Sequence, residues 1–234
     1  MKVVILAAGV GGRLGKKTQP KTLTLLANGQ SILEQQLDNI KSHTPLGNVI
    51  VVVGFHQEAI TEKFPTLHYV YNPGFAQENT SKSLLRALHA IDDDVLWLNG
   101  DVVFKHEILA EVLTQGKTKS CMVVNEGPVG DEEVKYTSDP DGKILHVSKN
   151  VENPKGEALG INYFRRGDVL ILKESLDRCG PKDYFEKAIE MSIEQGVDVR
   201  TCLVGQNDCT EIDFPEDLLR ANALLASWYK AKRV

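Results

Sequence analysis

The 234-residue chain lacks the features that mark disulfide-bonded, zinc-binding or membrane-spanning proteins. Its four cysteines form no C-x-x-C pair and match no zinc or redox spacing, so they are expected to be reduced residues of the core: Cys121, Cys179, Cys202 and Cys209. No run of about 18 apolar residues occurs, and the apolar run that follows Lys2 is too short for a signal peptide. These absences predict a cytoplasmic protein with no membrane partner.

Positive charge is also in short supply, with 27 Lys and Arg against 32 Asp and Glu and a net charge of −5. Nucleic acids and anionic membranes reward a basic surface, so neither is an expected partner. The six histidines stand singly, without a neighbour at metal-ligand or triad spacing, and no G-x-S-x-G motif occurs. Small molecules are therefore the expected ligands.

Short apolar runs alternate with segments of helical periodicity. The runs at 2–8, 48–53, 67–71, 95–99 and 121–124 include several that are continuous, which is typical of strands covered on both faces. Helical patterns occupy 31–42, 56–64, 79–91 and 106–115. This alternation predicts an α/β protein with a doubly wound, mostly parallel central sheet, formed by one domain over residues 1–234.

The pattern changes between residues 130 and 166. Turn signals at Pro140, Asp141 and Gly142 separate two alternating segments and predict a β-hairpin, which a further strand follows. We interpret 130–166 as an insertion or flap. Helices at 167–178 and 183–196, a strand at 198–205 and a closing helix at 215–231 are expected to complete the chain.

The loop after the first strand, LAAGVGGRLGKKTQPKTL, is rich in glycine and positive charge. It is not a dinucleotide fingerprint, because Leu14 stands where the third glycine belongs, and it is not a P-loop, because Val10 and Lys17 replace required residues. Glycine permits positive φ angles and a close approach of backbone N–H groups to a ligand. Together with Arg13 and Lys21, these donors suit a nucleoside triphosphate.

Two acidic residues follow strands at the expected ligand-binding edge of the sheet. Asp101 follows the strand at 95–99, where it can also simply close a turn. Asp213 follows a second short strand and, with Glu216 three residues later, has a spacing that by itself favours helix capping. Two like charges about 4 Å apart repel by about 4 kcal/mol at an effective dielectric constant of about 20. If the two carboxylates converge, Mg²⁺ is the expected partner.

The start of the helix predicted at 79–91 carries a surplus of small polar side chains. Asn79, Thr80, Ser81 and Ser83 can each cap the helix, but capping uses only one or two of them. Because this segment follows a strand and lies near the glycine-rich loop, Asn79 and Ser83 are candidates for reading the edge of a nucleotide base.

With its Pro20-Lys21 pair, the glycine-rich loop resembles the signature of nucleotidyltransferases that act on sugar phosphates and phospho-alcohols. The motifs NGD at 99–101 and EIDFPEDL at 211–218 occur in the order found in that family, so the resemblance covers the whole chain. The segments NPGFAQENTSKSLL, VSK at 147–149 and GEALGINYF look most like the bacterial phosphocholine and phosphonate cytidylyltransferases.

The resemblance implies a Rossmann-like nucleotidyltransferase fold and a Mg²⁺-dependent reaction. A phosphate or phosphonate oxygen of a small metabolite would attack the α-phosphate of CTP and release pyrophosphate. Arg13 and Lys21 would be catalytic, and Asp101 and Asp213 would hold Mg²⁺. The implied nucleotide-binding residues are Leu6, Ala7, Ala8, Gly9, Gly11, Gly12, Asn79, Ser83 and Gly100.

The flap at 130–166 would lie on the acceptor side of the site. Lys149 and Glu157 are expected to face the acceptor, although both can also be ordinary hairpin charges. Aromatic residues are only 6% of the chain, and candidates to surround a quaternary ammonium group are Tyr136, Tyr163, Phe164 and Tyr184.

Several alternatives stay open. A sugar-1-phosphate uridylyl- or thymidylyltransferase could use the same loop, and a catalytically silent nucleotide-binding regulatory domain is a hypothesis of another class. A homodimer that pairs the hairpins of two copies is an alternative to a hairpin that covers its own site.

Overall fold

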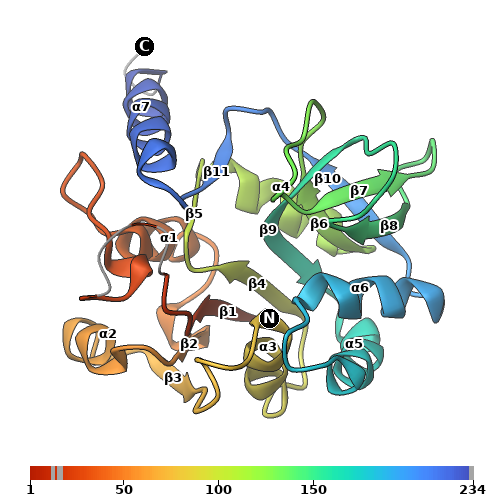
Figure 1. Ribbon diagram of the computed structural model, residues 1–234, viewed down its shortest axis with the longest axis horizontal. Coiled ribbons are helices and arrows are strands. Elements are labelled where there is room, and N and C mark those ends of the chain that lie inside the picture. The colour runs from red at the N-terminus through yellow and green to blue at the C-terminus, as the bar shows by residue number, and fades with distance from the viewer. Residues whose placement is uncertain (12–13, 15–17, 232–234) are drawn as a thin grey trace.

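The computed structural model describes residues 1–11, 14 and 18–231 (Figure 1). Its centre is a twisted sheet with the strand order β10-β6-β9-β4-β1-β2-β3. The strands are β1 (Lys2–Ala7), β2 (Val49–Val53), β3 (His68–Tyr71), β4 (Val95–Asn99), β6 (Ser120–Val124), β9 (Gly156–Phe164) and β10 (Val199–Leu203). Neighbours pair in parallel except for β9, which runs antiparallel to both β4 and β6. The mostly parallel sheet predicted from the sequence is confirmed.

Helices cover both faces of this sheet, as the continuous apolar strands predict. The helices are α1 (Ile32–Ile40), α2 (Gln57–Lys63), α3 (Thr80–Leu88), α4 (Glu107–Gly116), α5 (Arg166–Arg178), α6 (Phe185–Glu194) and α7 (Pro215–Ala231). Alternate residues of β1 point to opposite faces, so Val4 packs with the cluster beneath α3, α5 and α6, while Ile5 packs with α1, α2 and α4. None of the described helices is long and apolar enough to cross a membrane.

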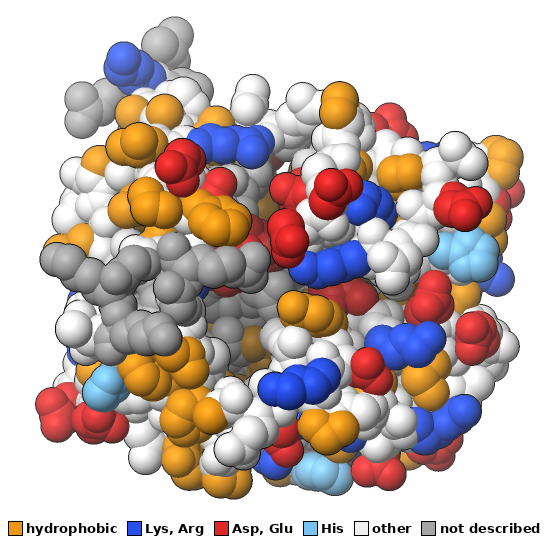
Figure 2. Space-filling model, viewed as in Figure 1, with side chains coloured by type: hydrophobic (Ala, Val, Ile, Leu, Met, Phe, Trp, Pro, Cys, Tyr) orange, Lys and Arg blue, Asp and Glu red, His pale blue; other side chains and the backbone are white. Residues whose placement is uncertain are grey.

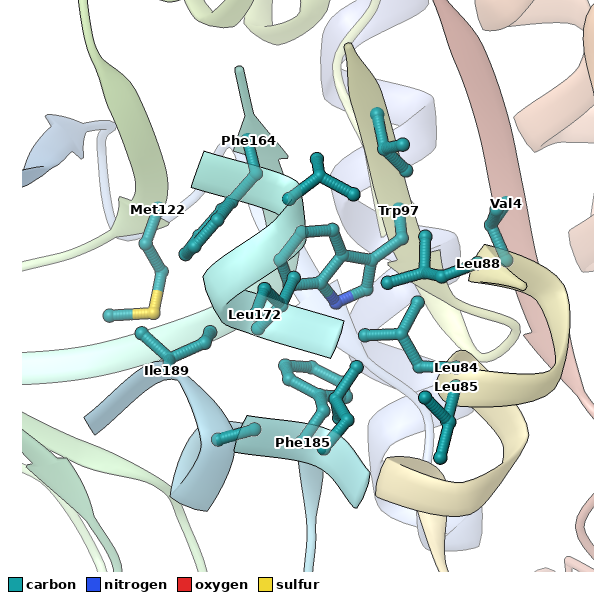
Figure 3. Close-up of a cluster of buried hydrophobic side chains, with 14 of the residues drawn as sticks. Val4, Leu84, Leu85, Leu88, Trp97, Met122, Phe164, Leu172, Phe185 and Ile189 are labelled. Atoms are coloured by element: carbon teal, nitrogen blue, oxygen red, sulfur yellow. The ribbon is translucent and has the colours of Figure 1, made fainter. Parts of the chain in front are cut away.

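The first of these clusters is organised around an indole ring (Figure 3). Trp97 of β4 is fully buried, and its ring centroid lies 5.1 Å from that of Phe164 and 5.7 Å from that of Phe185. Phe185 is the first residue of α6, and Leu84 and Leu88 of α3 pack nearby. The starts of α3 and α6 are therefore anchored to the same part of the core.

The hairpin expected in 130–166 is present, but the segment differs from the prediction at its end. β7 (Lys135–Ser138) and β8 (Ile144–Ser148) form the hairpin, and its turn contains Gly142 at φ +81°. The following strand is not part of an insertion, because β9 lies inside the main sheet between β4 and β6. Nearly all of its residues are buried, and this two-sided burial requires a central place in the sheet.

A second, two-stranded sheet was not predicted as a unit. β5 (Val102–Phe104) pairs antiparallel with β11 (Cys209–Glu211), with Glu211 opposite Val102. Beyond this pair, the backbone N–H of Ile212 donates to the carbonyl of Asp101 at 3.0 Å. This pairing carries the segment before α7 across to the end of β4 and brings the two acidic motifs together.

Candidate active site

A cleft opens where β1 and β4 end. One side is lined by the ends of these strands, by the start of α3 and by the segments that hold Lys21 and Asp213. The other side is lined by residues of the 132–134 segment, Lys149, Ala158 of β9, and Tyr184 and Glu186 at the start of α6. Figure 2 shows this face hollowed beside the grey atoms, with acidic and basic side chains on its opposite rim.

Three of the predicted site residues meet at the bottom of the cleft. The ammonium nitrogen Nζ of Lys21 lies 2.7 Å from Asp101 Oδ2 and 2.5 Å from Asp213 Oδ1. Burial alone would lower the pKa of Lys21, but attraction and hydrogen bonds from the two carboxylates outweigh it and raise this pKa above its ordinary value. Lys21 is therefore charged at neutral pH and lies between the side chains of Asp101 and Asp213.

Two of the predicted nucleotide-binding glycines are required by close packing at this place. Gly11 has φ +60°, and a Cβ atom there would lie 2.7 Å from the Cβ of Lys21. At Gly100, a Cβ atom would lie 2.7 Å from the carbonyl oxygen of Leu6. Only glycine lets the first loop and the turn after β4 approach this closely.

The turn after β4 is held from behind by α1. The side-chain amide of Gln36, which is fully buried, donates to the carbonyls of Asn99 at 2.9 Å and Val102 at 2.8 Å. Asn99 in turn donates from Nδ2 to Glu211 Oε1 at 3.0 Å. These contacts fix the backbone on both sides of Asp101 and so fix the position of its carboxylate.

Glu211 is an acidic group that the sequence analysis did not single out. Burial, followed by the negative charge of Asp101, raises the pKa of the Glu211 carboxyl well above its usual range, although the Asn99 bond opposes this. It lies two residues before Asp213 in the quoted EIDFPEDL motif and lines the cleft. Its position within that motif is the signal that could have identified it.

The residues present fit a bound Mg²⁺ ion. Asp101 Oδ1 is buried and has no hydrogen-bond partner in the described part of the chain, so one carboxylate oxygen beside Lys21 is available as a ligand. Mg²⁺ is typically held by one or two protein carboxylates together with water and substrate phosphates. Among the described residues, no group of three or more His, Cys, Asp and Glu side chains forms a preassembled metal centre. The arrangement suits an ion that arrives with a nucleotide.

The opposite side of the cleft is formed by residues next to the β7–β8 hairpin and by the start of α6. Lys149 Nζ lies 5.3 Å from the centroid of the Tyr184 ring and 3.3 Å from Glu132 Oε2. Glu186 is only 6% exposed, and its Oε2 has no hydrogen-bond partner among the described residues. Burial raises the pKa of Glu186 to about 7, although its own backbone N–H and the charge of Lys149 act in the opposite direction. Glu186 was missed because a glutamate in a helical pattern is usually a surface residue.

Three predicted residues are not brought into the cleft. Ser83 is buried on the inner side of α3 and accepts a hydrogen bond from Asn72 Nδ2 at 3.0 Å. Ala8 is also buried, and its carbonyl accepts from the N–H of Phe55 at 3.0 Å. Glu157 accepts from Asn125 Nδ2 at 3.3 Å, and burial raises the pKa of its carboxyl. Each of these residues has a partner within the fold and does not line the cleft, so its contact with a nucleotide or an acceptor stays a prediction.

Most of the remaining predicted residues line the cleft. Leu6, Ala7, Gly9, Gly11, Asn79, Gly100 and Lys149 line the cleft. Asn79 is also the N-cap of α3, accepting from the N–H of Thr80 at 2.8 Å. Of the four aromatic candidates, only Tyr184 lines the cleft, because Tyr136, Tyr163 and Phe164 are buried in the core. Gly12 and Arg13 lie outside the described residues.

The fold is that of nucleotidyltransferases. The model of the MobA-like NTP transferase domain matches residues 3–172, and the chain belongs to this family. The CTP:phosphocholine cytidylyltransferase from Streptococcus pneumoniae has a similar structure, with a TM-score of 0.78, 20% identity and coverage of 96% of this chain and 98% of that chain.

Curated relatives are similar over different shares of the chain. The bifunctional protein GlmU of Methanococcus maripaludis strain C5 is 30% identical over 240 residues, which is 95% of this chain and 54% of that protein. The CMP-5'-(3-aminopropyl)phosphonate synthase of Streptomyces rubellomurinus is 37% identical over 117 residues, 47% of this chain and 18% of that protein. The chain thus spans about half the length of the Methanococcus relative. Its match to the Streptomyces relative covers 18% of that protein.

Proposed function

We propose that the chain is a Mg²⁺-dependent cytidylyltransferase, which transfers CMP from CTP to a small metabolite bearing a phosphate or phosphonate group. In this reaction an acceptor oxygen forms a bond to the α-phosphorus of CTP. The bond from that phosphorus to the bridging oxygen of the β-phosphate breaks, and pyrophosphate leaves with the electron pair.

The observation that carries this proposal is the meeting of Lys21, Asp101 and Asp213 at the strand ends. A lysine held by two carboxylates is charged and positioned, and a triphosphate bound beside it would compete for its ammonium group. The glycine backbone at Gly9 and Gly11 lines the same part of the cleft and offers room for phosphate oxygens. Cation, anion pair and open backbone are the parts that nucleotidyl transfer requires.

Each group has a distinct part in the proposed reaction. Lys21 would stabilise the negative charge that grows on the phosphate oxygens as the new bond forms. Asp101 and Asp213 would hold Mg²⁺, which when bound neutralises phosphate charge and assists the departure of pyrophosphate. No side chain has to form a covalent bond with the substrate, so positioning and electrostatics would supply the catalysis.

The choice of CTP and of the acceptor class rests on one relative and on one side chain of the cleft. The name of the Streptomyces relative describes a product that contains CMP and a phosphonate. On the acceptor side, Lys149 lines the cleft and could balance the charge of a phosphate or phosphonate group.

A substrate panel tests the proposal. The purified chain would be incubated with Mg²⁺, one of CTP, UTP, dTTP or ATP, and one of several phosphate, phosphonate and sugar-1-phosphate acceptors, with pyrophosphate release as the readout. We expect release with CTP and a phosphate- or phosphonate-bearing acceptor, and its loss when Mg²⁺ is chelated.

Other outcomes of the same panel assign the alternatives. Release only with UTP or dTTP and a sugar 1-phosphate would identify a sugar-nucleotide synthase. Thermal stabilisation by CTP and Mg²⁺ without pyrophosphate release on any acceptor would identify a nucleotide-binding regulatory domain.

A further inference from the structure

Two loops from distant parts of the chain are tied together at the mouth of the cleft. One is the start of α3 at Asn79–Ser81, and the other precedes α6. The N–H of Asn79 donates to the carbonyl of Pro181 at 2.7 Å, and the hydroxyl of Ser81 donates to the carbonyl of Asp183 at 2.6 Å. Ser81 and Asp183 are 102 positions apart in the sequence. These contacts join the two loops directly.

The central contact between these loops comes from a threonine hydroxyl. The backbone N–H of Phe185 donates to Thr80 Oγ1 at 3.1 Å. Phe185 is the first residue of α6, and its N–H is one of the four helix-start donors that no carbonyl of the helix can satisfy. Tyr184, the N-cap residue of α6, makes no side-chain capping bond. The Thr80 hydroxyl therefore caps a helix to which it does not belong.

Both loops contribute residues to the lining of the cleft. Asn79 and Thr80 line it from α3, beside the strand ends where the nucleotide is proposed to bind. Tyr184 and Glu186 line it from the first turn of α6. Glu186 is 6% exposed with one oxygen that has no partner among the described residues, so its carboxylate is poised for a ligand group. A shift of the first turn of α6 would move both acceptor-side residues.

We propose that Thr80 is a positioning residue that couples the nucleotide side of the cleft to the acceptor side. A nucleotide that fixes the Asn79–Ser81 loop would, through Thr80 Oγ1, fix the first turn of α6 and place Tyr184 and Glu186 for the acceptor. This inference rests on the proposed function. Because coupling between two binding sites is reciprocal, a bound acceptor would also favour the nucleotide.

The chain offers a matched set of variants to test the coupling. Thr80→Val removes the hydroxyl and keeps the shape, Thr80→Ser keeps the hydroxyl, and Thr80→Ala removes it without a second branch in case the valine variant does not fold. Thr114→Val is the control, because the exposed Thr114 hydroxyl donates only within α4, to the carbonyl of Ala110 at 2.8 Å. Thermal unfolding checks that each variant is folded.

The readout is the acceptor KM compared with the nucleotide KM, for the substrate pair that gives most pyrophosphate. Loss of one hydrogen bond at a helix start corresponds to about a five- to tenfold effect. We expect Thr80→Val to raise the acceptor KM by about that factor at saturating nucleotide and, because the coupling is reciprocal, to raise the nucleotide KM by a similar factor at saturating acceptor. The Kd of the nucleotide measured without acceptor is expected to change by less than about twofold, and Thr80→Ser and Thr114→Val are expected to stay near the unchanged chain. Equally weakened binding of the nucleotide alone, an unchanged acceptor KM, or failure of Thr80→Ser to restore it would overturn the inference.

A double-mutant cycle with Glu186→Gln adds an independent readout. If Thr80 acts by placing Glu186, the increase in acceptor KM caused by Thr80→Val is expected to shrink to less than about twofold once Glu186 is already glutamine. Two effects that simply multiply would contradict the inference. If the unchanged chain releases no pyrophosphate with any pair, the proposed function fails and the inference falls with it. If the unchanged chain is active but the Thr80 variants do not show the expected KM changes, the inference is overturned and the proposed function stands.

Discussion

The two sides of the cleft are built in different ways. The nucleotide side combines strand ends of the doubly wound sheet with short loops, and its charged centre joins three segments through Lys21, Asp101 and Asp213. The acceptor side gathers residues from the 132–134 segment, the end of β8, β9 and the start of α6. The first is fixed by sheet topology, and the second by contacts between loops. We therefore expect substitutions to damage catalysis on the nucleotide side and acceptor affinity on the other.

The largest expected effect comes from Asp101→Ala. The substitution removes a carboxylate from the proposed metal site and leaves Lys21 bound to Asp213 alone, so we expect turnover to fall by at least about 10³-fold. Steady-state pyrophosphate release across a range of Mg²⁺ concentrations measures this loss. Asp38→Ala is the control, because Asp38 is an exposed carboxylate paired with Lys41 on α1. If Asp101→Ala kept an activity close to that of the unchanged chain, Asp101 would not be a ligand of the metal.

Lys21→Ala is expected to lower turnover by about 100-fold and to change the nucleotide KM much less, because the lysine acts mainly on charge that develops during the reaction. It also leaves two carboxylates without their shared cation. We therefore expect Mn²⁺ alone to bind the variant more tightly than the unchanged chain, as measured by paramagnetic resonance titration. Lys41→Ala, on an exposed ion pair of α1, is the matched control. A nucleotide KM that collapses while turnover survives would refute the role given to Lys21.

On the acceptor side, Glu186→Gln is expected to alter the pH dependence of stability. Burial raises the pKa of Glu186 to about 7, whereas a glutamate in the unfolded chain titrates near 4.5. Between these two values the folded chain holds a proton that the unfolded chain has lost, so this group destabilises the fold increasingly as pH rises and reaches its full cost above pH 7.

The glutamine variant does not carry this cost. Its free energy of unfolding is expected to exceed that of the unchanged chain by up to about 3 kcal/mol at pH 8, with little difference near pH 4.5. Urea unfolding at the two pH values measures the difference. An equal effect at both pH values would mean that Glu186 ionises normally in the folded chain.

The smallest effect is expected from Ser83→Ala. Because the Ser83 hydroxyl accepts from Asn72 in the core, its removal is expected to lower the free energy of unfolding by about 1 kcal/mol. The nucleotide KM is expected to stay unchanged. A selective rise in nucleotide KM, with no loss of stability, would restore the original interpretation of Ser83 as a residue that reads the base.

The sequence could name residues of the nucleotide side because its motifs are local, namely the glycine-rich loop with Lys21 and the NGD motif with Asp101. For Asp213, spacing alone favoured helix capping, and its expected place beside the metal came from the resemblance to nucleotidyltransferases. The acceptor side carried no such signal. Glu186 has the spacing of an ordinary helical residue, and the bond from the N–H of Phe185 to Thr80, at the start of α6, joins residues 105 positions apart.

Two differences between prediction and structure have the same origin. Ser83 was grouped with Asn79 by proximity in sequence, but Asn79 is the N-cap of α3, whereas Ser83 lies further along the helix, where its hydroxyl is buried and accepts from Asn72. The strand at Gly156–Phe164 follows the hairpin directly, and its antiparallel place between β4 and β6 depends on pairings with distant strands. Chain order alone does not determine such pairings. The homodimer stays an open alternative, and the absence of nucleic-acid partners stays a prediction.

The most direct measurement of the central claim is Mn²⁺ binding in the presence of CTP, followed by paramagnetic resonance for the unchanged chain, Asp101→Asn and Asp213→Asn. The account predicts one protein-bound ion with the unchanged chain and at least about tenfold weaker binding in each variant. Equal Mn²⁺ binding by all three proteins would contradict the claim that these two carboxylates hold the metal of a nucleotidyltransferase.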